Sequence, residues 1–181
     1  MFSRKSAFTL VEILTVLVII GIASAVVIPQ LGTRDDIKVA SAARTLTADL
    51  IYAQNLAISQ QKYIYIRFDV ANNNYKLLNV ANSSGDTLLS HPITQKSYIQ
   101  QFGAASSTLS SVSIQSVDFD GVDSTIADEF TLAFDEMGAP FAFCYDVNKD
   151  SEIKNGVIVL KSGGFTATVT VQPYTGEILV Q

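Results

Sequence analysis

A single glutamate, Glu12, lies inside the apolar run near the start of the chain. From Phe8 to Leu31 there are 24 residues, and Glu12 is the one ionisable side chain among them. A charge at membrane depth costs roughly 2.5–3.5 kcal/mol on insertion scales, so we expect it to be retained only where another group uses it. The chemistry predicted for Glu12 is therefore charge pairing with a partner that the apolar run itself does not supply.

Oxygen-bearing side chains recur at alternate positions in a second segment, at Asp146, Asn148 and Asp150. At this spacing they can converge on one hard cation such as calcium. The EF-hand pattern fails twice, because Ser151 stands where glycine makes the sharp turn and Val157 where a bidentate glutamate belongs. A solvated turn between strands is the alternative, since Asp and Asn favour turns. Calcium is the one cofactor that the sequence allows for.

Catalytic arrangements are not evident in the sequence. The one cysteine, Cys144, excludes an intramolecular disulfide, and the one histidine, His91, excludes a multi-histidine metal centre. We find no nucleophile elbow, phosphate loop or histidine-centred triad. We therefore expect a protein that is not an enzyme, and an enzyme on a membrane tether is a remote alternative.

The charge of the chain argues against a nucleic-acid partner. Residues 62–181 carry seven Lys and Arg against thirteen Asp and Glu, so this part is acidic. Neutralisation of phosphates supplies most nucleic-acid affinity, and a binder should show a basic cluster. No such cluster appears after residue 62, so no nucleic acid is expected to bind.

The apolar run from Phe8 to Leu31 has several interpretations. As a helix it is about 36 Å long at 1.5 Å per residue, enough for a hydrocarbon core of about 30 Å. Arg4 and Lys5 precede it, which keeps the short N-terminus in the cytoplasm by the positive-inside tendency. A secretory signal peptide ending in A-S-A at residues 23–25 is one alternative, and a plain membrane anchor is another. A signal peptide requires a continuous apolar core, which Glu12 interrupts. A plain membrane anchor leaves Glu12 without a role.

Residues 7–13, A-F-T-L-V-E-I, resemble the signature of type IV prepilins. In that family a short basic leader, here residues 1–7, is removed on the cytoplasmic side and the new amino terminus is N-methylated. The resemblance places the cut between Ala7 and Phe8 and the methylation on Phe8, both carried out by the prepilin peptidase/methyltransferase. The family usually has glycine before the cut, and Ala7 departs from that pattern while remaining small.

The resemblance also supplies a partner for Glu12, which becomes the fifth residue after the cut. When subunits stack in a filament, its carboxylate can meet the free amino terminus of a neighbour, because a paired desolvated charge is tolerated where an isolated one is not. We hypothesise that this pair favours assembly and sets the register between subunits. Pro29 lies in the same assembly helix, residues 8–31, and its missing N–H and ring clash predict a kink there.

Residues 32–61 are predicted to continue the helix with an amphipathic pattern. Apolar residues recur at steps of four and three along one face: Val39, Ala43, Leu46, Leu50, Ala53 and Ala57. Asp49 is among the polar residues that lie away from this face. If the helix breaks after Pro29, Thr33 or Asp35 can cap its second part.

Residues 62–181 change to the alternating pattern of strands and are predicted to form a β-rich globular domain. The predicted strands are residues 63–68, 75–80, 87–89, 112–119, 130–134, 141–145, 157–160, 165–171 and 177–180. The expected fold class is α+β, pilin-like, with a long N-terminal helix, transmembrane then amphipathic, packed on an antiparallel sheet.

Within the pilins, residues 50–58, 134–140 and 175–178 are similar to landmarks of the GspH/FimT group of minor pseudopilins. That resemblance implies a structural subunit of the short periplasmic filament of a type II secretion system. It implies other pseudopilins or pilins as partners and a single pass through the bacterial inner membrane, with the globular domain in the periplasm. A minor pilin of a type IV pilus, acting in pilus assembly, adhesion or DNA uptake, is the alternative.

Overall fold

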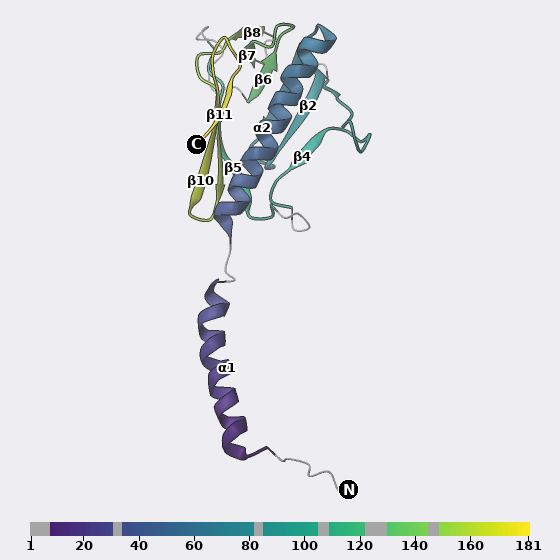
Figure 1. Cartoon of the computed structure of the whole chain (residues 1–181). Helices are drawn as coiled ribbons and strands as arrows, with labels where there is room; N and C mark the ends of the chain where they lie inside the picture. Colours follow the sequence, from purple (N-terminus) through teal and green to yellow (C-terminus); the bar gives the residue numbers. More distant parts are fainter. Residues whose placement is uncertain (1–7, 31–33, 82–84, 105–108, 122–129, 145–148) are drawn as a thin grey trace. The chain divides into compact units, whose positions relative to one another are not determined.

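The computed structural model describes residues 8–30, 34–81, 85–104, 109–121, 130–144 and 149–181 (Figure 1). The chain divides into two compact units, Met1–Arg34 and Asp35–Gln181. The first contains helix α1, and the second contains helix α2 and all the described strands.

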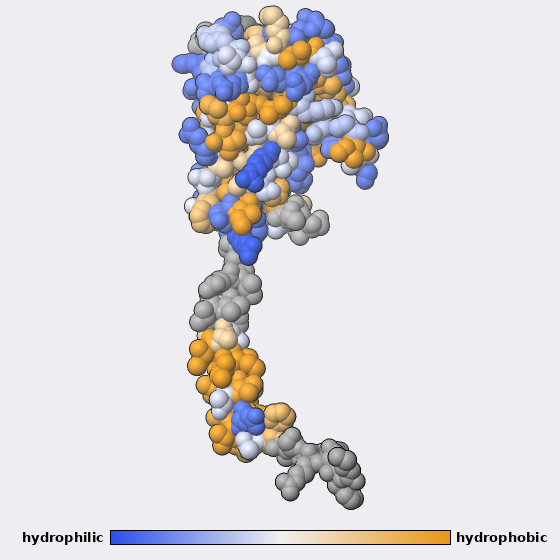
Figure 2. Space-filling view, viewed as in Figure 1, coloured by the Kyte–Doolittle hydropathy of each residue, from blue (hydrophilic) through white to orange (hydrophobic). Residues whose placement is uncertain are grey.

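Helix α1 covers Leu10–Gln30 and is apolar on every side over its described length. Leu10 is 81% exposed and Leu17 64%, and the other large side chains of the helix up to Ile22 are about half exposed or more. Figure 2 shows this hydrophobic surface along the helix. Among the described residues, no helix has both the length and the apolar character that crossing a membrane requires.

Helix α2 covers Asp35–Gln60, and Arg34 before it is not helical. The predicted apolar face is confirmed, since all six of its residues, from Val39 to Ala57, are buried. The helix ends in a left-handed residue, Gln61 with φ 52°, and the Lys62 N–H donates to the Ala57 carbonyl at 3.2 Å. This is the hydrogen bond of a Schellman motif, here without the usual glycine.

The described strands form two antiparallel sheets. The larger has the order β3-β2-β1-β6-β7-β8, with β4 also pairing with β2, and the smaller has the order β11-β10-β9-β5. The strands of the larger sheet are β1 (Ile64–Asp69), β2 (Asn74–Val80), β3 (Thr87–Leu88), β4 (Ile99–Gln101), β6 (Thr131–Phe134), β7 (Pro140–Cys144) and β8 (Lys149–Glu152). Those of the smaller sheet are β5 (Val112–Asp118), β9 (Val157–Ser162), β10 (Phe165–Val171) and β11 (Ile178–Val180).

The predicted α+β class and all nine predicted strands are confirmed, with ends that shift by one or two residues. Two features differ from the prediction. The strands divide into two sheets rather than one, and α2 packs its buried face against strands of both, notably β9, β10 and β1 (Figure 1). Strands β4 and β8 were not predicted, because both are short and β8, with the sequence K-D-S-E, has no apolar residue.

A hairpin-like segment that we call the arm, residues 89–98, leaves the larger sheet between β3 and β4. Its two ends pair with β2, since the Leu89 N–H donates to the Leu77 carbonyl at 2.9 Å and the Leu77 N–H donates to the Tyr98 carbonyl at 3.1 Å. An isolated bridge between Ser90 and Ser97 closes the arm. The arm is therefore fixed to the sheet at its base.

A half-buried carboxylate, Asp49 of α2, ties the arm to the helix. It accepts hydrogen bonds from the hydroxyls of Tyr75 at 2.6 Å and Tyr98 at 2.9 Å, one on each oxygen. The Tyr98 ring also stacks on Tyr52 of α2, with centroids 5.8 Å apart. Burial raises the pKa of Asp49, although the two hydroxyls and the nearby His91 lower it in part. Burial and the Asp49 charge raise the pKa of both tyrosines.

Two turns meet near the carboxyl end of α2, at Gln54, and form a surface that we call the tip. The first turn, residues 135–139, joins β6 to β7, and the second, residues 172–177, joins β10 to β11. The Gln54 side-chain amide donates to the carbonyls of Gly138 at 2.9 Å and Gly176 at 3.4 Å. Both glycines have positive φ, and a Cβ on Gly176 would lie 2.7 Å from the Gly138 carbonyl. A single side chain of α2 therefore holds together one turn from each sheet.

We predict that Asp49→Asn changes how stability depends on pH. A carboxyl whose pKa is raised by folding adds stability below its unfolded pKa, here 3.8, and this stability is lost as the pH rises through the folded pKa. The free energy of unfolding of the unmodified chain should therefore fall relative to that of the variant as the pH rises above about 4. Urea denaturation of the full chain in detergent, between pH 4 and 7, measures this. Asp36→Asn, an exposed change on the same helix, is the control, and parallel curves for the chain and Asp49→Asn would contradict the prediction.

We predict that Gln54→Ala destabilises the domain by about 1–3 kcal/mol, because two carbonyls lose their shared donor. Asn55→Ala is the matched control, since Asn55 is the next residue of the helix and is exposed. Its effect should stay within about 0.5 kcal/mol. Thermal denaturation of the two variants measures both values, and equal melting temperatures would show that the contact between the turns does not depend on Gln54.

Candidate assembly site

Glu12 lies in the first turn of α1, three residues after Thr9, which caps the helix. The Thr9 hydroxyl accepts a hydrogen bond from the Glu12 N–H at 3.2 Å, and the Thr9 carbonyl accepts one from the Ile13 N–H at 3.2 Å. Thr9-Leu10-Val11-Glu12 has the spacing of a capping box, in which a threonine at the cap is followed three residues later by glutamate or glutamine. Thr9 was not among the predicted site residues, although this spacing identifies it as a cap.

Glu12 is the acidic residue in the first turn of α1. A carboxylate near the amino end of a helix interacts favourably with the helix dipole, by about 0.3–1 kcal/mol at exposed sites. Over the described part of the chain, however, the salt bridges involve Asp35 and Asp86 and not Glu12. The charge that pairs with Glu12 is therefore to be sought in another molecule or in the residues before Phe8.

The first turn of α1 presents a mixed surface. Phe8 is 76% exposed and precedes the cap, and a shallow apolar pocket is lined by Phe8, Thr9, Leu10, Ile13, Leu14 and Leu17. An apolar surface of this extent, with one acid beside it, is typical of an interaction site. Its geometry suits packing and charge pairing.

The other predicted site residues of the amino-terminal unit lie at or beyond its described ends. Ala7, where the leader is expected to be cut, lies outside the described residues. Pro29 lies next to the last described residue of α1, Gln30, and the residues that follow, 31–33, lie outside the described part of the chain. The kink stays a prediction.

The predicted calcium segment is described only in part. Asp146 and Asn148 lie outside the described residues, and Asp150 lies in β8, where it pairs with Phe143 of β7. Residues 149–152 form a strand that is hydrogen-bonded to β7, so Asp150 does not lie in a turn. Within the described ranges no three His, Cys, Asp or Glu side chains are grouped as a metal site. Calcium binding stays a prediction.

The structure brings together two sequence landmarks that are far apart in the chain. Residues 134–140 contain the first turn of the tip and residues 175–178 overlap the second, and both contact Gln54. Gln54 belongs to the third landmark, residues 50–58. The three motifs therefore describe one structural junction, which the sequence could not show because Gln54 is 84 residues from Gly138 and 122 residues from Gly176 in the chain.

Comparison with known proteins supports the description of the amino-terminal segment and that of the fold. Residues 2–28 match the family model of the prokaryotic N-terminal methylation motif. No curated protein matches the chain.

Solved structures resemble the chain in fold. The minor pseudopilin EpsH from the type 2 secretion system of Vibrio cholerae has 12% sequence identity and a TM-score of 0.52, over 80% of this chain and 96% of that chain. A second EpsH structure has 14% identity and a TM-score of 0.51, over 82% and 95% of the two chains. The type IV minor pilin FimU of Pseudomonas aeruginosa has 15% identity and a TM-score of 0.47, over 81% and 90%.

These findings agree with the predicted GspH/FimT-like pseudopilin. At such low identities the EpsH structures show the fold, and the matched motif shows the kind of amino terminus that precedes it. The chain combines the N-terminal methylation motif of prepilin-type proteins with the pilin-like fold seen in minor pseudopilin EpsH.

Proposed function

We propose that the chain is a minor pseudopilin that assembles into the short periplasmic filament of a type II secretion system. The observation that carries this proposal is the first turn of α1, where Glu12 follows the Thr9 cap on a helix that is exposed and apolar throughout its described length. The methylation motif and the fold shared with EpsH support it. The role is structural and needs no catalytic residue.

The proposed assembly contact pairs two charges that come from different subunits. Cleavage between Ala7 and Phe8 exposes an α-amine at the start of α1, and N-methylation keeps its positive charge. The Glu12 carboxylate of a neighbouring subunit then meets this amine within apolar surroundings. Each charge is costly when it is buried alone, so their pairing favours the assembled state over an isolated subunit. The contact also sets how far one subunit is displaced along its neighbour.

In this proposal residues 8–31 hold the subunit in the inner membrane before assembly. The run has one ionisable side chain in 24 residues and follows Arg4 and Lys5, which favours a cytoplasmic amino terminus. The domain that begins at Asp35 then lies in the periplasm. It has its own buried core, formed by α2 and the two sheets, so it folds without contributions from α1.

The processing step predicts one mature amino terminus. Purified from membranes of cells that contain a prepilin peptidase, the chain should begin at Phe8 and carry one added methyl group on its α-amine. Mass spectrometry of the intact chain and of its first proteolytic fragment measures both. A chain that begins at Val26, as after signal peptidase, or one that still begins at Met1 would contradict the proposal.

Glu12→Gln separates the charge of Glu12 from its place in the capping box, because either glutamate or glutamine can occupy the third position of that motif. Removing one partner of a buried ion pair costs about 3–5 kcal/mol. Incorporation into filaments should therefore fall by more than about a hundredfold, with loss of secretion, while cleavage at Phe8 continues. Quantitative immunoblotting of sheared or cross-linked filaments measures incorporation.

Thr9→Val is the matched control, since it removes the hydroxyl cap and leaves the charge. It should weaken the start of the helix by about 0.5–2 kcal/mol and leave assembly largely intact. Normal incorporation of Glu12→Gln would exclude the ion pair. An equal loss in both variants would assign the role of Glu12 to the helix cap instead.

A further inference from the structure

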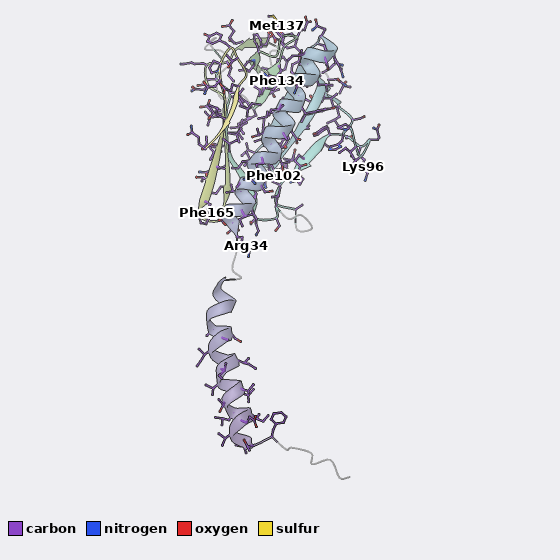
Figure 3. All side chains as sticks on the ribbon, viewed as in Figure 1. Arg34, Lys96, Phe102, Phe134, Met137 and Phe165 are labelled. Carbon is purple, nitrogen blue, oxygen red and sulfur yellow. The ribbon has the colours of Figure 1, made fainter. Side chains whose placement is uncertain are left out.

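His91 lies between the base of the arm and its exposed end. It is half-buried, whereas residues 92–97, which we call the end of the arm, are exposed. The His91 ring lies against the Tyr98 ring, with centroids 4.6 Å apart, and the Tyr98 hydroxyl is bound to Asp49. Lys96 marks the end of the arm in Figure 3, at the side of the domain. The His91 ring therefore connects the end of the arm with the contact that fixes its base.

The ring of His91 also organises the turn that follows it. The His91 Nδ1 accepts hydrogen bonds from the backbone N–H groups of Ile93 at 3.2 Å and Thr94 at 3.3 Å. Asp and Asn side chains hold turns in the same way. A histidine nitrogen accepts a hydrogen bond only when it carries no proton, so this arrangement requires a neutral imidazole with its proton on Nε2. The order of the turn therefore depends on the protonation state of one side chain.

A protonated His91 would have other partners on the same side of the arm. The titratable groups around it lie on α2 (Asp49 and Tyr52), on β2 (Tyr75) and on the arm (Lys96 and Tyr98). Asp49 is the acid among them, and the His91 charge is near enough to lower the pKa of Asp49 in part. A cation within about 6 Å of an aromatic ring is also attracted to it, which favours an imidazolium against Tyr98. The tyrosines stay neutral and Lys96 is exposed to solvent, so neither opposes this exchange of partners.

We propose that His91 is a pH-sensitive switch that orders the end of the arm when it is neutral and releases it when it is protonated. A proton from solvent that binds Nδ1 turns this atom from an acceptor into a donor. The N–H groups of Ile93 and Thr94 then lose their shared acceptor, and the imidazolium pairs with Asp49. Histidine side chains ordinarily change charge near pH 6.5, so the switch operates close to neutral pH.

The switch acts on the end of the arm and leaves its base in place. The base is held by the hydrogen bonds of Leu89 and Tyr98 with the backbone of Leu77, which do not involve the His91 ring. The side chain that the switch affects most is Ile93, which is 85% exposed and is held in one position by the ordered turn. Protonation therefore changes how the arm presents an apolar group to solvent. This inference concerns the globular unit alone and does not rest on the proposed function.

Exchange of backbone amides with water tests the switch. Nuclear magnetic resonance of the ¹⁵N-labelled full chain in detergent gives the exchange rate of each N–H group between pH 5.5 and 7.5. Protection, the ratio of the rate expected for an unstructured chain to the measured rate, removes the intrinsic effect of pH. The protection of the Ile93 and Thr94 N–H groups should fall about three- to tenfold as the pH is lowered, as expected for the loss of one hydrogen bond each. The Leu89 N–H, at the base, should keep its protection throughout.

Two variants separate the acceptor from the charge. His91→Asn is the matched control, since asparagine keeps an acceptor for the N–H groups two and three residues later and does not titrate. In this variant the protection of the Ile93 and Thr94 N–H groups should be the same at every pH. Asp49→Asn keeps a polar partner for the two tyrosines and removes the charge that attracts the imidazolium. The midpoint of the change should therefore move to lower pH in Asp49→Asn.

Three results would overturn the proposal. The first is equal protection of the Ile93 and Thr94 N–H groups at pH 5.5 and 7.5 in the unmodified chain. The second is a loss of protection in His91→Asn that matches the loss in the unmodified chain, because the titrating group would then lie elsewhere. The third is a parallel loss at the Leu89 N–H, which would show that the whole arm opens and not its end alone.

Discussion

An apolar helix that carries one carboxylate has two requirements. Its apolar surface must be shielded from water, and its carboxylate must be paired with an opposite charge. In the described part of α1 the side chains from Leu10 to Ile22 are about half exposed or more, and the hydrogen bonds of the first turn use the backbone of Glu12 and not its carboxylate. The cost of leaving such a surface in water is large, at roughly 25 cal/mol for each Å² of apolar area. This constraint explains why the proposed function is an assembly function. In the proposed function, lipid and other subunits cover this helix.

The globular unit meets the opposite requirement, because it completes its own core. Helix α2 buries its apolar face against both sheets, and small residues at Ala42, Ala43, Ala53 and Ala57 let the strands approach the helix closely. Two polar side chains of the same helix then connect more distant segments. Asp49 binds the arm through Tyr98, and Gln54 binds the two turns of the tip. Both side chains are half-buried, and polar groups that are shielded from water are costly unless they are hydrogen-bonded, so each fixes the segment that satisfies it.

These connections give the unit two exposed surfaces of defined shape. The Tyr98 hydroxyl ties the arm to α2, and Gln54 ties the two turns of the tip to the same helix. Because both are held by α2, their exposed apolar side chains are positioned by the core and not by the local turn alone. An apolar group that is held in water is free to contact a partner at little cost in conformational entropy.

Much of the fold could be predicted from the sequence, because local pattern determines it. The buried face of α2 follows from apolar residues at steps of four and three, and the nine predicted strands follow from alternation and turn residues. The importance of Glu12 follows from one charge in an apolar run. Strands β4 and β8 could not be predicted, because their polar residues gain backbone hydrogen bonds only when β2 and β7 lie beside them.

The sequence by itself determined that the chain has an apolar helix with a single acid, an amphipathic helix and a β-rich acidic domain. Only the tertiary structure decided that the strands divide into two sheets around α2, since pairing of distant strands depends on the whole core. It also decided that Asp49, which the helical pattern places on the polar face, is half-buried and bound by two tyrosines, one from β2 and one from the arm. Burial at such a position depends on what packs against the helix, and it cannot be inferred from the neighbouring residues in the chain.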